Sequence, residues 1–481
     1  MKTLFVALSS SYIHTVLAAR YLAVNSPVKT DVFETNVNVP IEKNFAYIKE
    51  YLPDVVAFSC YIFNISYVVE LLKKIREELP FCKIILGGYE AAGNVEMLSP
   101  LCDYIIKGEG DFAFGELLEK IQNSEVSIPK VIEAGTVKQL DSIVSPYTDE
   151  YLQLIKKSHI VYMETCRGCP FDCSYCMSST THGVRSFSFD RIESDFEKIM
   201  AYDPPLLKLV DRTFNYDRRR AQRIFTFLSE RYGHTRTRFH FEIAPELFDE
   251  ELFGCIEKVP SGLFQFEIGV QSYNAETLRA VHRKADPAVV DANIKRLLSM
   301  HNVVVHVDLI AGLPCEDKKT FIKGFDRLLS LQPDCMQSGF LKILKGSRMA
   351  TQTEGYVVRE EPPYEIVRSP LMTEEDLAEL KRTCEMLDLY YNSERFKSSM
   401  AYLFTKSTPY ALFSGLAQAF ALSPYENKNF SSTRQCDLLF EHGKTFLTKE
   451  EAAELEECIY NDFIASGNTR KWHKWIKTEK K

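Results

Sequence analysis

Three cysteines within one short segment are the residues of this sequence best suited to chemistry. Cys169, Cys173 and Cys176 lie in the stretch Glu164-Thr-Cys-Arg-Gly-Cys-Pro-Phe-Asp-Cys-Ser-Tyr-Cys-Met177, with three and then two residues between them. Three thiolates on one loop can hold three corners of a [4Fe–4S] cubane, which prefers cysteine sulfur. The spacing therefore predicts an iron–sulfur site whose fourth iron is open to a small molecule.

A fourth cysteine leaves other metal sites open. Cys166 forms a C-x₂-C pair with Cys169, so four cysteines within eleven residues could instead close a structural zinc site or a four-cysteine electron-transfer cluster. The spacing differs from that of bacterial ferredoxins and of paired zinc knuckles. We expect Cys166 to be a non-ligand at the end of a strand, with a non-catalytic iron–sulfur or zinc-binding protein as the alternative.

The bulk composition is that of a globular chain. It has 481 residues, is 45% hydrophobic and carries a formal net charge of −8, which gives no reason to expect nucleic-acid binding. No stretch approaches the ~20 apolar residues of a membrane span, and no signal peptide is recognised. Thirteen cysteines without a secretory signal indicate thiols or metal ligands in a reducing cytosol, so we expect a cytoplasmic protein.

Alternating strand-like and helical segments predict a doubly wound, Rossmann-like α/β domain over residues 1–130. The clearest helix is Tyr67–Leu79, and polar loops follow the strands, where such sheets bind ligands. The expected strands are Thr3–Leu8, Val28–Glu34, Asp54–Ser59, Lys83–Leu86 and Tyr104–Ile106.

A second alternating pattern predicts a partial (β/α)6 barrel over residues 159–360, after a weakly periodic linker at 131–158. Barrel chemistry takes place at the loops that follow the strands, and the cysteine segment follows the first strand. The expected strands are Ile160–Glu164, Leu206–Asp211, Arg238–Ile243, Leu263–Val270, Val303–Ile310 and Met336–Ile343. The expected helices are Phe189–Ala201, Arg219–Arg231, Glu250–Ile256, Ala288–Ser299 and Lys318–Leu331.

Residues 361–481 are expected to form a mostly helical domain. Thr373 precedes three acidic residues, which is typical of a capped helix start, and helical periodicity follows over Leu377–Tyr391 and Lys449–Ile464. We expect this domain to cover the barrel mouth and to exclude water from the site there.

The cysteine segment resembles that of the radical S-adenosylmethionine (SAM) superfamily, whose signature is C-x₃-C-x-Φ-C with an aromatic residue, here Tyr175, before the last cysteine. The resemblance implies that the open iron binds SAM, which is cleaved reductively to a 5′-deoxyadenosyl radical that abstracts a substrate hydrogen. An electron donor such as flavodoxin or ferredoxin is then required.

Polar residues at consecutive strand ends strengthen the resemblance, and it implies that they bind SAM. Asp211 lies where family members bind the SAM amino group, and Arg283 is expected to pair with an acidic partner. The segment Asp308-Leu-Ile-Ala-Gly-Leu-Pro314 resembles the family's fifth-strand glycine motif beneath the adenine. The full set of expected SAM residues is Tyr175, Asp211, Glu242, Glu267, Gln271, Ser272 and Arg283.

The N-terminal domain resembles the cobalamin-binding domain of cobalamin-dependent radical SAM enzymes. The Asp-x-His-x-x-Gly motif that supplies a lower cobalt ligand is absent, as in many relatives, and His14 is expected to be a hydrogen-bonding group. Glycines in the strand-end loops allow a bulky ligand to approach the backbone. The expected cobalamin residues are Ser9, Tyr12, Ser59, Tyr61, Gly87, Gly88, Gly108 and Gly110.

Together these features predict an oxygen-sensitive radical SAM enzyme that uses cobalamin, with methyl transfer to carbon or a related radical reaction on a small-molecule or peptide substrate. The overall resemblance is to the anaerobic magnesium-protoporphyrin cyclase-like group, with an uncharacterised helical C-terminal domain. A radical SAM enzyme that binds no cobalamin is the alternative. No membrane or nucleic-acid partner is expected.

Overall fold

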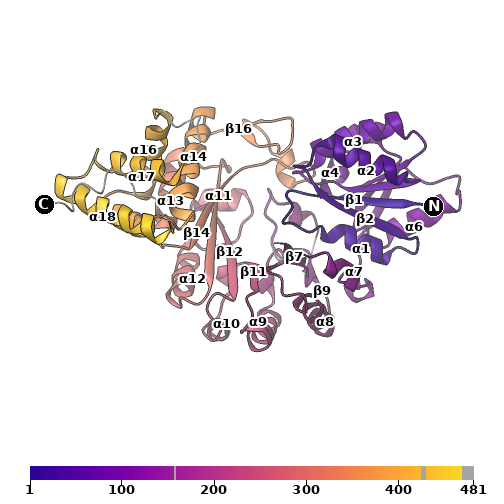
Figure 1. Cartoon of the computed structure of the whole chain (residues 1–481), viewed down its shortest axis with the longest axis horizontal. Helices are drawn as coiled ribbons and strands as arrows, with labels where there is room; N and C mark the ends of the chain where they lie inside the picture. Colours follow the sequence, from indigo (N-terminus) through magenta and orange to yellow (C-terminus); the bar gives the residue numbers. More distant parts are fainter. Residues whose placement is uncertain (156–158, 182, 424–429, 468–481) are drawn as a thin grey trace.

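Two six-stranded sheets, both entirely parallel, form the framework of the protein (Figure 1). The computed structural model describes residues 1–155, 159–181, 183–423 and 430–467. In the first sheet the strand order is β2-β1-β3-β4-β5-β6, and in the second it is β14-β13-β12-β11-β10-β7.

The first sheet is covered by helices on both faces, which confirms the predicted doubly wound domain. Successive residues of a strand point to opposite faces, so Leu4 and Val6 face one apolar core while Phe5 and Ala7 face another. The strands are β1 (Thr3–Ser9), β2 (Thr30–Asn36), β3 (Val55–Ser59), β4 (Lys83–Gly87), β5 (Tyr104–Gly108) and β6 (Val131–Gly135). The helices are α1 (Leu17–Asn25), α2 (Ile41–Tyr51), α3 (Ile65–Glu78), α4 (Tyr89–Gly93), α5 (Val95–Leu98) and α6 (Ala113–Gln122).

The segment 131–158, expected to be a linker, contains regular structure. Its first residues form β6, which pairs in parallel with β5 and extends the first sheet to Gly135. Helix α7 (Asp149–Gln153) follows, capped by Thr148, and residues 156–158 lie outside the described residues. β6 has only five residues, none of them buried, so its apolar pattern is too short to stand out within this weakly periodic segment.

The second sheet is the predicted partial barrel, with six strands in sequence order. They are β7 (Ile160–Met163), β10 (Leu206–Leu209), β11 (Arg238–Ile243), β12 (Phe264–Gln271), β13 (Val304–Ala311) and β14 (Cys335–Phe340). The helices are α8 (Phe189–Met200), α9 (Arg218–Tyr232), α10 (Glu250–Ile256), α11 (Ala275–Ala280), α12 (Pro287–Ser299) and α13 (Lys318–Leu329). Each of these helices begins with a side chain that accepts a hydrogen bond from the first turn, which fixes where the loop ends. The capping residues are Ser188, Asp217, Asp249, Asn274, Asp286 and Asp317.

A cluster of phenylalanines joins the barrel strands to α9. Phe225, fully buried, has its ring centroid 5.1–5.8 Å from those of Phe214, Phe241, Phe264 and Phe266. Aromatic pairs at this separation add to the hydrophobic stabilisation from burial, so the cluster fixes the wall behind the strand ends.

The C-terminal region is helical, as predicted, but its helices do not cover the barrel mouth. They are α14 (Glu374–Leu387), α15 (Lys397–Leu403), α16 (Pro409–Ala421), α17 (Ser432–Gly443) and α18 (Lys449–Ala465). Thr373 caps α14 in a capping box with Asp376, as the sequence indicated. Tyr410 and Phe413 of α16 pack on Phe325 of α13, outside the barrel and at the end of the molecule opposite to the first sheet (Figure 1). The expectation of a helical cap is therefore wrong.

The segment between β14 and α14 reaches the N-terminal domain instead. It carries the short strands β15 (Val357–Val358) and β16 (Ile366–Arg368). Lys345 Nζ donates to Asn94 Oδ1 over 2.6 Å, and the Tyr364 hydroxyl donates to Glu90 Oε2 over 2.8 Å. This segment, and not the helical region, closes the barrel on the side of the N-terminal domain.

Among the described residues, no helix has both the length and the apolar character required to cross a bilayer.

We expect Phe225→Ala to lower the free energy of unfolding by about 3–5 kcal/mol, because the truncation leaves a cavity within the aromatic cluster. The urea midpoint of the barrel, followed by circular dichroism, measures the change. Phe81→Ala is the matched control, since Phe81 is 94% exposed and its removal leaves no cavity. Equal midpoints for the two variants would contradict this account of the barrel wall.

Candidate cofactor-binding site

The three candidate ligands lie on a loop closed by a two-stranded stem. Strand β8 (Cys166–Arg167) pairs antiparallel with β9 (Arg185–Ser186), and the loop between them carries Cys169, Cys173 and Cys176. Gly168 has a φ of +98°, and a Cβ at that position would lie 2.0 Å from the carbonyl oxygen of Gly183. Only glycine fits this crossing, so the residue before the first cysteine is fixed by the backbone of the stem.

The far side of the loop is anchored to the barrel. The Ser174 amide donates to the Val281 carbonyl over 3.0 Å, and the Met349 amide donates to the Ser174 carbonyl over 2.8 Å. Arg348 donates twice to the Asp172 carboxylate, over 2.6 and 2.7 Å. The loop is thus held at both ends without using the three cysteine side chains.

The three predicted ligands and Cys166 have different surroundings. Cys169 Sγ lies 3.6 Å from Thr213 Oγ1, and Cys173 Sγ lies 4.0 Å from Arg283 Nη1. Cys166 is buried in β8, where burial and the neighbouring Asp211 raise the pKa of its thiol. Cys166 thus belongs to the stem, whereas the three predicted ligands lie in the loop between the stem strands, which favours the three-cysteine set.

This donor set fits a cluster with one open iron. Half-buried Cys169 and Cys176 and buried Cys173 all belong to one loop, and cysteine sulfur is what cubane clusters prefer. In the part of the chain that the structure describes, no three His, Cys, Asp or Glu side chains are placed to hold a single metal ion. The zinc alternative therefore gains no support from the geometry.

Asp211 does not present a free carboxylate to the site. Its Oδ1 accepts hydrogen bonds from the amides of Thr165 and Cys166, over 2.8 and 2.6 Å, and its Oδ2 accepts from the Thr165 hydroxyl over 2.6 Å. The side chain is buried and ties β10 to the stem of the cysteine loop. The expected contact with the SAM amino group stays a prediction for this carboxylate, whose hydrogen bonds here are made within the protein.

Arg283 contacts the cluster loop and not an acidic partner. It donates through Nη2 to the Gly269 carbonyl, and Nη1 faces Cys173 Sγ. No ion pair within 4 Å is found for Arg283 among the described residues, and its Nε has no hydrogen-bond partner there. The guanidinium is placed to donate to the sulfur of Cys173, where it would lower the cost of negative charge on a bound cluster.

The other residues expected near SAM gather at the end of β12. Gln271 has a φ of +70° in a β-bulge, and its side chain folds over Gly269. The Ser272 hydroxyl donates to Glu316 Oε1 over 2.5 Å, and Tyr175 packs beside Cys173 with its phenol pKa raised by burial. Tyr175 thus lies at the cysteine loop and Gln271 and Ser272 at the end of β12, and the expected contacts of the three with SAM stay a prediction.

Glu242 and Glu267 lie side by side inside the barrel but differ in their partners. Glu267 contacts His240 Nε2 at 2.9 Å and Lys208 Nζ at 3.3 Å, and these contacts lower its pKa to about 2. Burial raises the pKa of Glu242, which has only the more distant Arg212 and Lys208 to offset it. The Glu267 carboxylate is therefore bonded to protein groups, whereas the Glu242 carboxyl lacks a close cation and can accept a hydrogen bond from a ligand.

Two further carboxyls near the site were not singled out by the sequence. Burial, with Glu267 and Glu242 nearby, raises the pKa of Asp308 to about 7, and its Oδ1 has no hydrogen-bond partner among the described residues. Burial likewise raises the pKa of Glu316 to about 7. Asp308 begins the glycine motif of the fifth strand, and Glu316 follows the motif. An acidic residue in or next to this apolar segment was the signal that the sequence offered.

A cavity of about 940 Å³ lies between the N-terminal domain and the barrel. Tyr12 is not part of its wall and is 70% exposed, so its predicted role in cobalamin binding is not supported. The other residues expected to bind cobalamin all line the cavity, namely Ser9, Ser59, Tyr61, Gly87, Gly88, Gly108 and Gly110.

Two of these glycines are required by the backbone. Gly88 has a φ of +90°, and a Cβ there would lie 2.6 Å from the Cys60 carbonyl oxygen. Gly108 has a φ of +95°, and a Cβ there would lie 2.5 Å from the Gly135 carbonyl oxygen. The close packing of backbone on backbone thus requires glycine at both positions, and the turns that carry them line the cavity.

The opposite wall of the cavity belongs to the barrel and to the cysteine loop. It includes Tyr162, Arg167, Met177, Arg212 and Lys345. His14 Nδ1 lies 2.6 Å from the Tyr162 hydroxyl, which fits the hydrogen-bonding role expected for this histidine. Neighbouring Thr15 donates to the Ile160 carbonyl over 3.0 Å, so the loop after β1 covers the exposed edge of β7.

Comparison with known families agrees with this division of the chain. The B12 binding domain matches residues 3–118, the radical SAM superfamily matches residues 163–328, and a protein family of unknown function, DUF4080, matches residues 353–481.

Several curated relatives and solved structures are similar to this chain. The cobalamin-dependent radical SAM methyltransferase TokK of Streptomyces tokunonensis is 26% identical over 316 residues, which are 58% of this chain and 45% of TokK. The hopanoid C-3 methylase of Methylococcus capsulatus is 26% identical over 314 residues, 59% of this chain and 58% of that protein. The chain thus spans about half the length of these relatives.

The solved structure of the cobalamin-dependent SAM radical enzyme OxsB, with aqua-cobalamin and SAM bound, is similar in fold. Its TM-score is 0.64 at 12% identity, with 97% of this chain and 84% of OxsB covered. At this identity the likeness confirms the fold alone.

The chain contains a B12-binding domain and a radical SAM domain. This pair of domains confirms the predicted cofactor set of a [4Fe–4S] cluster, SAM and cobalamin. The finer resemblance to the magnesium-protoporphyrin cyclase-like group stays a prediction, as does the assignment of individual residues to each cofactor.

Asp308 predicts a pH-dependent stability. Its pKa of about 7 exceeds the unfolded value of about 3.9, so its contribution to stability is full below pH 3.9 and is lost as the pH rises towards 7. Asp308→Asn removes this loss. Relative to wild type, the variant should gain up to about 3 kcal/mol between pH 5 and pH 8, because about two pKa units lie in that interval.

Urea unfolding of the cofactor-free protein at the two pH values measures this gain. Asp203→Asn, at an exposed position, is the control and should show no such change. A difference between Asp308→Asn and wild type that stays the same at both pH values would refute a raised pKa.

Proposed function

We propose that the chain is a cobalamin-dependent radical SAM enzyme that transfers a methyl group to a carbon of its substrate. The observation that carries this proposal is that one cavity is lined both by the glycine loops of the B12-binding domain and by the stem of the cysteine loop. The two cofactor sites therefore open onto the same space, where a substrate could meet both. The methyltransferase and methylase activities of the relatives support this choice.

When bound, the cofactors supply a hydrogen-abstracting radical and a methyl donor. The chain's own residues position them. Cys169, Cys173 and Cys176 hold the cluster, Arg283 donates towards Cys173, and Gln271 and Ser272 face the bound SAM. Gly87, Gly88, Gly108 and Gly110 give cobalamin close access to the backbone.

The barrel interior is suited to a substrate that donates hydrogen bonds. Asp308 has an unpaired carboxylate oxygen, and Glu242 lacks a close cation. Buried acceptors of this kind lose free energy unless a donor reaches them, so a hydroxyl or nitrogen-bearing small molecule or peptide fits this interior.

The proposed reaction also requires a reductant, and we propose a flavodoxin or ferredoxin in this role. All thirteen cysteines are free thiols in the structure. Unpaired thiols and an oxygen-sensitive cluster are consistent with a reducing, cytoplasmic setting.

Substitution of the ligands should separate them from Cys166. After anaerobic reconstitution with iron and sulfide, Cys169→Ala, Cys173→Ala and Cys176→Ala should each lose the EPR signal of the reduced cluster and form no 5′-deoxyadenosine above background. The matched control Cys166→Ser should retain both. If Cys166→Ser loses the cluster as fully as the other three, the vacant iron site and the proposed activity are both wrong.

Cobalamin binding should depend on the backbone at Gly88. Gly88→Ala should weaken hydroxocobalamin binding at least ~5-fold, since a cost of about 1–3 kcal/mol falls on the turn that lines the cavity. Gly254→Ala, a helical site with open space around the new Cβ, is the control and should bind as wild type does. Optical titration measures both, and a wild-type protein that binds no hydroxocobalamin would remove cobalamin from the proposal.

A further inference from the structure

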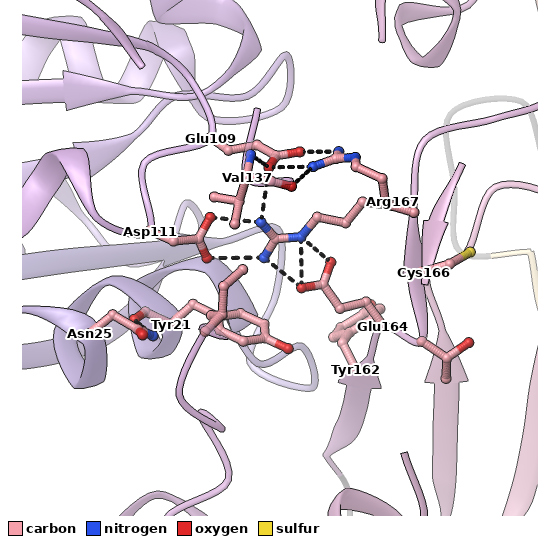
Figure 2. Close-up of polar contacts among 12 residues, drawn as sticks. Tyr21, Asn25, Glu109, Asp111, Val137, Tyr162, Glu164, Cys166 and Arg167 are labelled. Carbon is pink, nitrogen blue, oxygen red and sulfur yellow. Dashed lines mark hydrogen bonds and ion pairs between the residues drawn. The ribbon is translucent and has the colours of Figure 1, made fainter. Parts of the chain in front are cut away.

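Arg167 links the cysteine loop to the N-terminal domain through a nearly buried guanidinium. It lies in β8, two residues before Cys169, and donates through Nη1 and Nη2 to the two oxygens of Asp111, over 2.7 and 3.0 Å. Nε and Nη2 donate to Glu164 over 3.0 and 2.6 Å (Figure 2). Its side chain is only 14% exposed and that of Asp111 only 6%. Its planar fork is thus fixed between two carboxylates from different domains.

The other strand of the stem, β9, makes a similar connection to the N-terminal domain. Arg185 is the cross-strand neighbour of Arg167, and it donates to both oxygens of Glu109 over 2.9 and 2.5 Å. Glu109 also accepts from the Val137 amide over 2.7 Å. Both strands that close the cysteine loop therefore end on the same short loop of the N-terminal domain, residues 108–111.

The loop 108–111 is also part of the cavity wall. Gly108, Glu109, Gly110 and Asp111 all line the space assigned to cobalamin, and Gly108 packs against Gly135 too closely for a side chain. A ligand that displaces this loop must displace Asp111 and hence Arg167. Since these charges are largely shielded from water, their geometry resists displacement more than a surface ion pair would.

We propose that Arg167 is a positioning residue that couples cobalamin binding to SAM binding at the cluster. The coupling rests on the proposed function, since it requires both cofactors to bind. Cobalamin in the cavity fixes the loop 108–111, Asp111 fixes Arg167, and Arg167 fixes the stem from which Cys169 extends. Coupling of this kind is reciprocal, so SAM must tighten cobalamin binding by the same factor.

A purely structural role makes a different prediction. An ion pair that only holds the domains together would, when lost, weaken each cofactor's binding by the same factor whether or not the other is present. The ratio of SAM affinities with and without cobalamin would then stay unchanged. This ratio is the quantity that distinguishes coupling from structural support.

The test measures the SAM dissociation constant of the anaerobically reconstituted full chain, with and without saturating hydroxocobalamin, from the SAM-induced change in the EPR spectrum of the reduced cluster. In wild type the ratio should be at least ~5-fold, within the usual range for coupled sites. In Arg167→Gln and Asp111→Asn it should fall to within about twofold of unity. The double variant should show no further loss, because both changes break one link.

Three controls keep the result interpretable. Arg76→Gln breaks a comparable ion pair, Arg76 with Asp103 at 2.6 Å, inside the N-terminal domain and should leave the ratio as in wild type. Arg167→Lys keeps the charge but not the fork, so it should restore only part of the ratio. Hydrogen exchange of residues 168–181 should slow when hydroxocobalamin is added to wild type. It should not slow in Asp111→Asn, a substitution that leaves the sequence of the cysteine loop unaltered.

The outcomes separate the two proposals. If wild type binds no hydroxocobalamin or no SAM, the proposed function fails. If both bind but their affinities are independent, or if Arg167→Gln and Asp111→Asn keep the wild-type ratio, the coupling is wrong and the proposed function stands. If Arg167→Gln does not fold, Asp111→Asn alone decides.

Discussion

The carboxyl ends of two parallel sheets face one cavity, and the rest of the structure follows from this constraint. Parallel strands place the loops that follow them at one edge of a sheet, and in both α/β folds this is the edge that binds ligands. Here the edge after β1, β3, β4 and β5 and the edge after β7 and β10 line the same cavity. The relative placement of the two domains thus determines whether two cofactor sites become one reaction space.

Three groups of polar contacts, here called seams, fix the placement of the N-terminal domain relative to the barrel. His14 and Thr15 cover the edge of β7, Arg167 and Arg185 bind the loop 108–111, and the segment after β14 bonds to α4. Each seam uses side chains that are bonded and largely buried, so an error in docking would leave charges or donors without partners. A large apolar interface would tolerate sliding, whereas these contacts specify one arrangement. The seams also surround the cavity, so the contacts that join the domains also shape its walls.

The sequence predicts what depends on short-range pattern and misses what depends on long-range contact. Hydrophobic periodicity located eleven of the twelve strands of the two sheets, and the cysteine spacing located the loop, because both signals lie within a few residues. The strand β6 was missed because it has only five residues and continues into a weakly periodic segment, so its pattern does not stand out. The helical cap was wrong because nothing in an amphipathic helix states which neighbour it covers, and here that neighbour is α13.

Residue roles show the same limit more sharply, because a carboxylate's role is set by its donors. Asp211 and Glu267 occupy positions at which the family suggests a ligand contact, yet each is bonded to groups brought in from other strands and loops. Asp308 and Glu316 lie in the same interior, where burial without enough hydrogen-bond donors raises their pKa values to about 7. Glu267 has a lowered pKa because His240 and Lys208 already bind its carboxylate, whereas Asp308 keeps one oxygen without a hydrogen-bond partner among the described residues. Position along a strand cannot separate these two cases; only the three-dimensional set of donors can.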